Sequence, residues 1–165
     1  MTALAQGIIL VLVWGFIATL VMTAALFIAQ NVGWSRLNLP YLVGAFFTGR
    51  RHESNVLGFI LYMLGGWLFA FLYYIVFSVV GASNWWIGGI TGFVHAMLLL
   101  ALAFPMLSYV HPRVASEFDG PDTRKVLEPP GFLALHYGYR TPMVVLVAQT
   151  AYGVILGVGF AQLFE

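Results

Sequence analysis

Four long apolar runs dominate the chain and decide its fold class. They cover residues 3–29, 56–80, 85–109 and 142–163. An α-helix needs about 20 apolar residues to cross the hydrocarbon core of a bilayer, and each run is at least that long. Because lipid offers the backbone no hydrogen-bond partners, runs of this kind fold as helices. We therefore expect an all-α, polytopic membrane protein with four transmembrane helices in a single integral membrane domain, residues 1–165.

The composition excludes several classes of protein. The chain is 61% hydrophobic and 8% charged, whereas soluble domains carry about 25% charged residues. A net charge of +1 gives no reason to expect nucleic acid as a partner. The absence of cysteine removes disulfides, thiolate metal ligands and cysteine nucleophiles. The first apolar run exceeds the roughly 7–15 residues of a signal-peptide core, so we expect it to remain as a membrane anchor.

The basic residues predict an orientation. All of them fall in two loops, residues 32–54 and 110–141: Arg36, Arg50, Arg51, Arg113, Arg124, Lys125 and Arg140. Positive charge is retained on the cytoplasmic side of a membrane, so both loops should be cytoplasmic and both termini outside. The uncharged turn at 81–84, followed by Trp85 and Trp86, suits the opposite surface. We expect a multi-pass protein of a prokaryotic inner (cytoplasmic) membrane.

Each charged loop also contains a Pro-initiated aromatic segment, residues 40–47 and 130–137. We expect both to be short interfacial elements. The helices that follow them share a spacing of small residues: Tyr62, Gly66 and Ala70 in one, Gln149, Gly153 and Gly157 in the other. This similarity suggests two parallel two-helix repeats. In a chain with 18 glycines, recurrence through composition alone is the alternative. Pro105 is expected to kink the third helix.

His95 is the most informative polar residue within the apolar runs. It lies ten residues after Trp85, which places it roughly 15 Å along a helix at about 1.5 Å per residue. It shares a helix face with Gly88 and Gly92, so it should point into the bundle. A neutral imidazole there could carry a proton, or bind a haem or chlorin as a cofactor. The alternative is a structural histidine that is hydrogen-bonded to Tyr62, Gln149 or Tyr152.

The remaining candidate residues concern packing and the membrane surface. We expect close helix packing at Gly88, Gly92, Gly153 and Gly157. Lipid or headgroup contact is expected at Arg50, Arg51, His136, Tyr139 and Arg140, where an ordinary aromatic and basic anchoring belt is the alternative. Metal binding is not expected, because no two histidines are spaced three or four apart. In the second loop, four basic residues should pair with four acids: Arg113, Arg124, Lys125 and Arg140 with Glu117, Asp119, Asp122 and Glu128.

Several of these features together resemble a known group of proteins. The pattern comprises residues 15–22 in the first helix, His95, the His111-Pro112 exit, and Tyr152-Gly153 with Gly157. It is similar to an uncharacterised family of small four-helix prokaryotic integral membrane proteins. The resemblance implies the four-helix fold and a recurrent histidine, and it implies no activity.

Three functions remain open at this point. No catalytic signature is present, so we do not expect an enzyme. The first hypothesis is a non-catalytic accessory or structural subunit of a larger membrane complex, such as a respiratory or photosynthetic electron transport complex, with other integral membrane proteins and lipids as partners. The second is a small transporter or channel with His95 and Gln149 in its pathway. The third is a helix bundle that binds haem or chlorin through His95.

Overall fold

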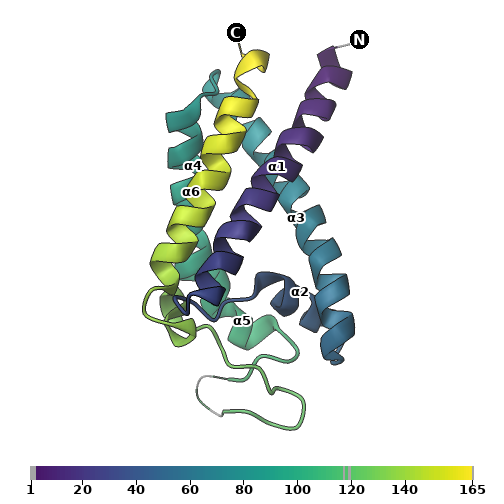
Figure 1. Cartoon of the computed structure of the whole chain (residues 1–165), viewed down its shortest axis with the longest axis vertical. Helices are drawn as coiled ribbons and strands as arrows, with labels where there is room; N and C mark the ends of the chain where they lie inside the picture. Colours follow the sequence, from purple (N-terminus) through teal and green to yellow (C-terminus); the bar gives the residue numbers. More distant parts are fainter. Residues whose placement is uncertain (1–2, 117, 119, 165) are drawn as a thin grey trace. The chain divides into compact units, whose positions relative to one another are not determined.

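All the regular secondary-structure elements of the described residues are helices. The computed structural model describes residues 3–116, 118 and 120–164 (Figure 1). In chain order the elements are α1 (Ala3–Asn31), α2 (Leu39–Phe47), α3 (Arg51–Val80), α4 (Trp85–Leu98), η1 (Leu99–Ala103), α5 (Phe104–Val110), η2 (Phe132–Tyr137), α6 (Thr141–Gly159) and η3 (Ala161–Leu163). Within the described residues, the β-type backbone pairing consists of isolated bridges in the loop before η2. The all-α prediction is confirmed for this part of the chain.

Four described segments are long and apolar enough to cross a membrane. They are Ala5–Asn31, Arg51–Val80, Trp85–Val110 and Thr141–Gly159. Each corresponds to one of the four apolar runs, so the four-span prediction is confirmed by length and composition. The third segment runs through α4, η1 and α5.

Helix α3 begins at Arg51, several residues before the expected start at 56. Polar contacts explain the longer helix. The Glu53 carboxylate lies in the first helical turn, where negative charge is favourable, and it accepts hydrogen bonds from Arg50 and from the Thr48 hydroxyl. The Ser54 hydroxyl donates to the Thr48 carbonyl at 2.9 Å. The expectation that residues 51–54 belong to a loop was therefore wrong.

The turn between α3 and α4 is as short as the sequence suggests. Gly81 has a φ of 74°, a left-handed conformation that glycine adopts without steric cost. The side chain of Asn84 then caps α4, because its Oδ1 accepts hydrogen bonds from the backbone N–H groups of Trp86 and Ile87 at 3.2 and 3.0 Å.

The third span changes its helical geometry immediately before Pro105. Proline has no N–H, and in an α-helix its ring clashes with the carbonyl four residues earlier. Here the chain widens into the π-helical turn η1, in which the Phe104 N–H bonds to the Leu99 carbonyl, and α5 follows. The sequence predicted a kink at this proline, and the structure has a π-helical turn.

The described residues form two compact units. Of these residues, the first unit contains 3–25, 63–96 and 146–164, and the second contains 26–62, 97–116, 118 and 120–145. Each of the four spanning helices contributes to both units.

Backbone contacts between α4 and α6 hold the first unit together. A Cβ added at Gly88 would lie 2.2 Å from the Gly153 carbonyl oxygen, and one at Gly153 would lie 2.1 Å from that of Gly88. Gly92 faces the Gln149 carbonyl and Gly157 faces the Asn84 carbonyl at comparable distances. Only glycine permits backbones to approach this closely.

An aromatic cluster fills the rest of the first unit. The rings of Tyr73 and Tyr152 meet edge to face, with centroids 5.4 Å apart, and Phe77 meets Phe160 in a similar way at 6.1 Å. These four side chains are almost completely buried. Edge-to-face pairs are favourable because the positive ring edge meets the negative ring face.

In the second unit, α2 lies directly against the beginning of α3. A Cβ at Gly44 would lie 1.8 Å from the Ser54 carbonyl oxygen, and one at Gly58 would lie 1.8 Å from that of Pro40. Asn38 caps α2 by accepting a hydrogen bond from the Tyr41 N–H at 3.0 Å. The expected interfacial element at 40–47 is therefore a regular, tightly packed helix.

The second Pro-initiated segment has a different conformation. Within η2, Leu133 and Ala134 have φ angles of 55° and 56°, in the left-handed region that side chains with a Cβ rarely adopt. Residues 130–137 are thus an irregular turn, whereas residues 40–47 form a helix. The two segments do not share the local structure that a repeated unit would give them.

The interlocked glycines generate a prediction about stability. Gly153→Ala should destabilise the protein by about 1–3 kcal/mol or more, because the new methyl group would overlap a backbone carbonyl of α4. Gly65→Ala is the matched control, since a Cβ there meets nothing within 4 Å, and alanine favours a helix interior. Thermal unfolding in detergent measures both. Equal unfolding temperatures for the two variants would contradict the packing described.

Candidate functional site

His95 belongs to a small polar cluster in the first unit. Its Nδ1 lies 2.7 Å from Nε2 of Gln149 and 3.2 Å from the Tyr73 hydroxyl. The Phe69 ring covers the imidazole, with centroids 4.4 Å apart. Gln149 and Tyr73 are buried. Two neighbouring helices, α3 and α6, thus fix one nitrogen of a histidine carried by α4.

The sequence identified part of this cluster. Of the three partners expected for His95, Gln149 is confirmed. The Tyr152 hydroxyl donates to the Gly66 carbonyl at 2.6 Å. Tyr62 belongs to the second unit. Tyr73 was missed, although its spacing of seven residues from Gly66 places it on the same face of α3.

The cluster leaves one polar atom without a partner. Nε2 of His95 is buried and has no hydrogen bond to any described residue. If the Gln149 amide N–H donates to Nδ1, Nε2 carries the ring proton. If the amide carbonyl faces Nδ1 instead, Nδ1 carries the proton and Nε2 keeps a lone pair. The orientation of one amide therefore decides whether Nε2 is a donor or a ligand atom.

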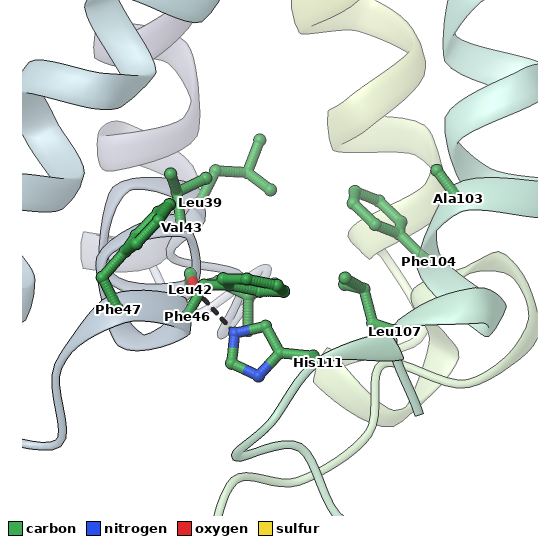
Figure 2. Close-up of a pocket in the computed structure, with 9 residues that line it drawn as sticks. All are labelled: Leu39, Leu42, Val43, Phe46, Phe47, Ala103, Phe104, Leu107 and His111. Carbon is green, nitrogen blue, oxygen red and sulfur yellow. Dashed lines mark hydrogen bonds between the residues drawn. The ribbon is translucent and has the colours of Figure 1, made fainter. Parts of the chain in front are cut away.

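The second unit contains an apolar pocket of about 260 Å³ (Figure 2). Its lining comes from α2 on one side and from η1, α5 and the residue after α5 on the other: Leu39, Leu42, Val43, Phe46 and Phe47, and Ala103, Phe104, Leu107 and His111. Figure 2 shows these two groups of side chains facing each other. The volume is slightly below the roughly 300–1,000 Å³ of most small-molecule sites.

His111 is the one ionisable residue in the pocket lining, and both its ring nitrogens are occupied. Nε2–H donates to the Leu42 carbonyl at 3.0 Å, and Nδ1 accepts the Arg113 backbone N–H at 3.1 Å. The side chain is 2% exposed, and the Phe46 ring meets it edge on at 5.3 Å. These contacts require the neutral imidazole. Burial lowers the pKa of His111, and the nearby Arg113 charge lowers it further, against the opposing effect of the Leu42 hydrogen bond.

Arg113 closes the C-terminal end of α2. Its Nη1 donates to the carbonyls of Ala45 and Phe46 at 2.5 and 3.1 Å. The last carbonyls of a helix lack intrahelical partners and carry partial negative charge, so a guanidinium is favourable there. The sequence placed Arg113 in a pairing with loop acids. No described acid forms an ion pair with Arg113, because the helix end offers acceptors. Its pairing with Glu117 or Asp119, which lie outside the described residues, stays a prediction.

The other members of the expected acid–base pairing have partners of several kinds. Arg140 lies over the rings of Trp34 and Tyr139, 5.3 and 5.1 Å from their centroids. Asp122 accepts the backbone N–H groups of Arg124 and Lys125, and these bonds lower the pKa of that carboxyl. Glu128 forms an ion pair with Arg36 of the first loop. Glu117 and Asp119 lie outside the described residues.

The residues expected at lipid headgroups are on the protein surface, with varied contacts. Arg50 is paired with Glu53 at 2.7 Å, and Arg51 is exposed without a partner among the described residues. His136 donates from Nδ1 to the Pro129 carbonyl at 2.9 Å. Tyr139 is exposed beside Arg140. Headgroup contact at these positions stays a prediction. Within the described residues, no group of three His, Cys, Asp or Glu side chains is placed to hold a metal ion.

Comparison with known proteins adds no further constraint: no family model, no curated protein and no solved structure matches this chain.

Because both ring nitrogens of His111 are hydrogen-bonded, we expect its mutation to destabilise the protein. His111→Ala leaves the Leu42 carbonyl and the Arg113 N–H without a side-chain partner in a buried place, which costs about 1–3 kcal/mol per unsatisfied group. His111→Gln keeps a donor and an acceptor and should lose less. Thermal unfolding in detergent compares the two. An unfolding temperature for His111→Ala equal to that of the wild type would show that the contacts stabilise nothing.

The same residue predicts a dependence on pH. Because the folded pKa of His111 is below its ordinary value of 6.5, the unfolded chain takes up a proton that the folded chain resists. Stability should therefore be full above about pH 6.5 and fall as the pH drops below it. The fall in unfolding temperature between pH 7 and pH 5 should be smaller in His111→Gln. An equal fall in both proteins would assign the effect to other groups.

Proposed function

We propose that this chain is a non-catalytic accessory subunit of a larger membrane protein complex. The observation that supports it best is a pair of exposed apolar side chains in the charged loop after α5. Phe118 is 83% exposed and Val126 is 64% exposed. Phe118 lies between Glu117 and Asp119 and Val126 follows Lys125, and the loop belongs to none of the four candidate membrane spans. An aromatic side chain exposed outside the spans is a candidate contact for a partner protein, because aromatic residues are enriched at protein–protein interfaces.

Backbone hydrogen bonds hold part of this loop together. The Ala115 N–H bonds to the Leu127 carbonyl, and the Leu127 N–H bonds to the Arg113 carbonyl. Val114 and Ala115 are almost completely buried. These bonds hold Leu127, the residue after Val126, against the buried strip at Val114 and Ala115. The Val126 side chain is therefore exposed from a backbone that is itself hydrogen-bonded, which lowers the entropic cost of binding a partner there.

The transporter remains the second candidate, and one observation favours it. The buried Nε2 of His95 has no partner among the described residues, as a proton or substrate site would require. Against it, several polar side chains of the spanning helices already donate hydrogen bonds to backbone carbonyls and are not available to line a pathway. Thr19 donates to the Gly15 carbonyl and Tyr152 to the Gly66 carbonyl. A haem or chlorin at His95 would further require the Gln149 orientation that leaves a lone pair on Nε2.

The proposal includes a location. The segregation of basic residues supports a prokaryotic inner membrane with both charged loops in the cytoplasm and both termini outside. Phe118 would then face the cytoplasm, and the host assembly would be a respiratory or photosynthetic one. Two parallel repeats stay a prediction that the spacing of small residues in α3 and α6 supports and that the different conformations of 40–47 and 130–137 speak against.

Site-specific crosslinking in the native membrane tests this function. A photoreactive phenylalanine analogue at position 118 should crosslink to one protein of defined mass. The same analogue at Phe93, which is half exposed on a spanning helix, should crosslink mainly to lipid. Phe118→Ala should reduce co-purification of that protein at least about tenfold if the side chain is an interface anchor, and Phe93→Ala should not.

Two results would contradict the accessory role. One is a chain that purifies alone, with position 118 crosslinked only to lipid. The other is a purified chain that moves protons into liposomes, or shows a haem or chlorin absorbance band, and loses that property in His95→Ala.

A further inference from the structure

The pocket between α2 and α5 lies where the third span ends. His111 follows Val110, the last residue of that span. The opposite wall is α2, which belongs to the charged loop rather than to a span. At the end of a membrane span we expect the hydrocarbon region to meet the headgroup region, which is where the acyl chains of a lipid join its charged headgroup.

The pocket wall offers a ligand almost no polar atoms. The two nitrogens of His111 are both committed to backbone groups. The other lining side chains are aliphatic or phenyl. A ligand inside must therefore be apolar itself, because a polar group there would lose its hydrogen bonds to water without replacement. The space also cannot admit a helix of another protein, whose diameter with side chains is about 10–12 Å.

A positive charge lies beside this apolar space. Arg113 uses Nη1 to hold the carbonyls of Ala45 and Phe46, and Phe46 also lines the pocket. Its Nε and Nη2 have no partner among the described residues. Gly49 helps to leave that edge open, since a Cβ there would lie 3.3 Å from Nε and 3.8 Å from Nη2. The ion pairs recorded for the described acids go to Arg36 and Arg50, so none neutralises Arg113.

We propose that this pocket binds an acyl chain of an anionic phospholipid, with the lipid phosphate at the open edge of Arg113. The apolar wall accounts for the chain, and Nε and Nη2 of Arg113, which have no partner among the described residues, account for the phosphate, since guanidinium groups bind phosphate through paired hydrogen bonds. Arg51, at the start of α3 and exposed, adds to the positive charge of the second unit. Together they favour an anionic lipid over a zwitterionic one of the same chain length.

Native mass spectrometry of the full chain in mild detergent tests the site. Phosphatidylglycerol and phosphatidylcholine with identical chains are added in equal amounts. We expect retention of phosphatidylglycerol at about fivefold the level of phosphatidylcholine, the size typical of one basic residue near an anionic headgroup. Equal retention of the two lipids would overturn the proposal.

Two pairs of variants assign the effect to the pocket. Ala103 is exposed and lines the pocket, so Ala103→Trp should fill it and abolish the preferential retention. Leu102→Trp is the control, because Leu102 is exposed on the same turn and does not line the pocket. Arg113→Gln should remove the preference for the anionic lipid, and Arg113→Lys should keep part of it.

Lipid retention by the Ala103 variant decides the proposal even if the Arg113 variant is perturbed. If Arg113→Gln loosens α2 and both lipids are lost, Ala103→Trp still decides, because it leaves Arg113 unchanged. Retention by Ala103→Trp equal to that of Leu102→Trp overturns the proposal. A change in oligomeric mass in Ala103→Trp, without a change in lipid retention, would assign the pocket to a second copy of the chain or another protein.

Discussion

The close approach of α4 and α6 is the contact on which the first unit depends. Lipid gives helices no hydrophobic reason to associate, so packing must come from surfaces that fit closely. Gly88 and Gly153 provide such surfaces, because each faces the other's carbonyl at a distance that excludes a side chain. Gly92 lies against the Gln149 carbonyl in the same way, three residues before His95. The contact between His95 and Gln149 is therefore a consequence of glycine packing, and so is the choice of proton position that Gln149 imposes.

Close glycine-mediated contact between helices also occurs in the second unit, where it positions a short helix. Gly44 and Gly58 bring α2 against α3, and two further side chains then hold its carbonyls: the neutral His111 donates to that of Leu42, and the Arg113 guanidinium donates to that of Ala45 near the C-terminal end. A nine-residue helix is too short to be stable alone in water, so these contacts account for its order. One consequence is a pocket whose polar wall atoms are already satisfied. Another is a guanidinium held at the pocket edge with part of its hydrogen-bonding capacity unused.

Much of this architecture can be predicted from the sequence, since hydrophobic length is a local property. The four spans, the short turn after Val80 and the disturbance before Pro105 all follow from residues close together in the chain. The failures concern partners that are distant in sequence. Arg113 was assigned to acids of its own loop, but its acceptors lie 67 and 68 residues away at the end of α2. The apolar pocket was missed for the same reason. Its two walls come from different loops and spans, and neither wall has a distinctive motif.

The proposed accessory role assigns the contacts with partners and lipid headgroups to the charged loops, and the proposal places both loops in the cytoplasm. Because the chain has no cysteine, a single introduced cysteine reports its own location without background. The most direct measurement is labelling of Ala82→Cys and Arg124→Cys, in separate proteins, with a membrane-impermeant thiol reagent on intact cells and on inverted membrane vesicles. Position 82 should react in cells and position 124 only in inverted vesicles. The reverse pattern, or labelling of both positions from the same side, would contradict the proposed orientation.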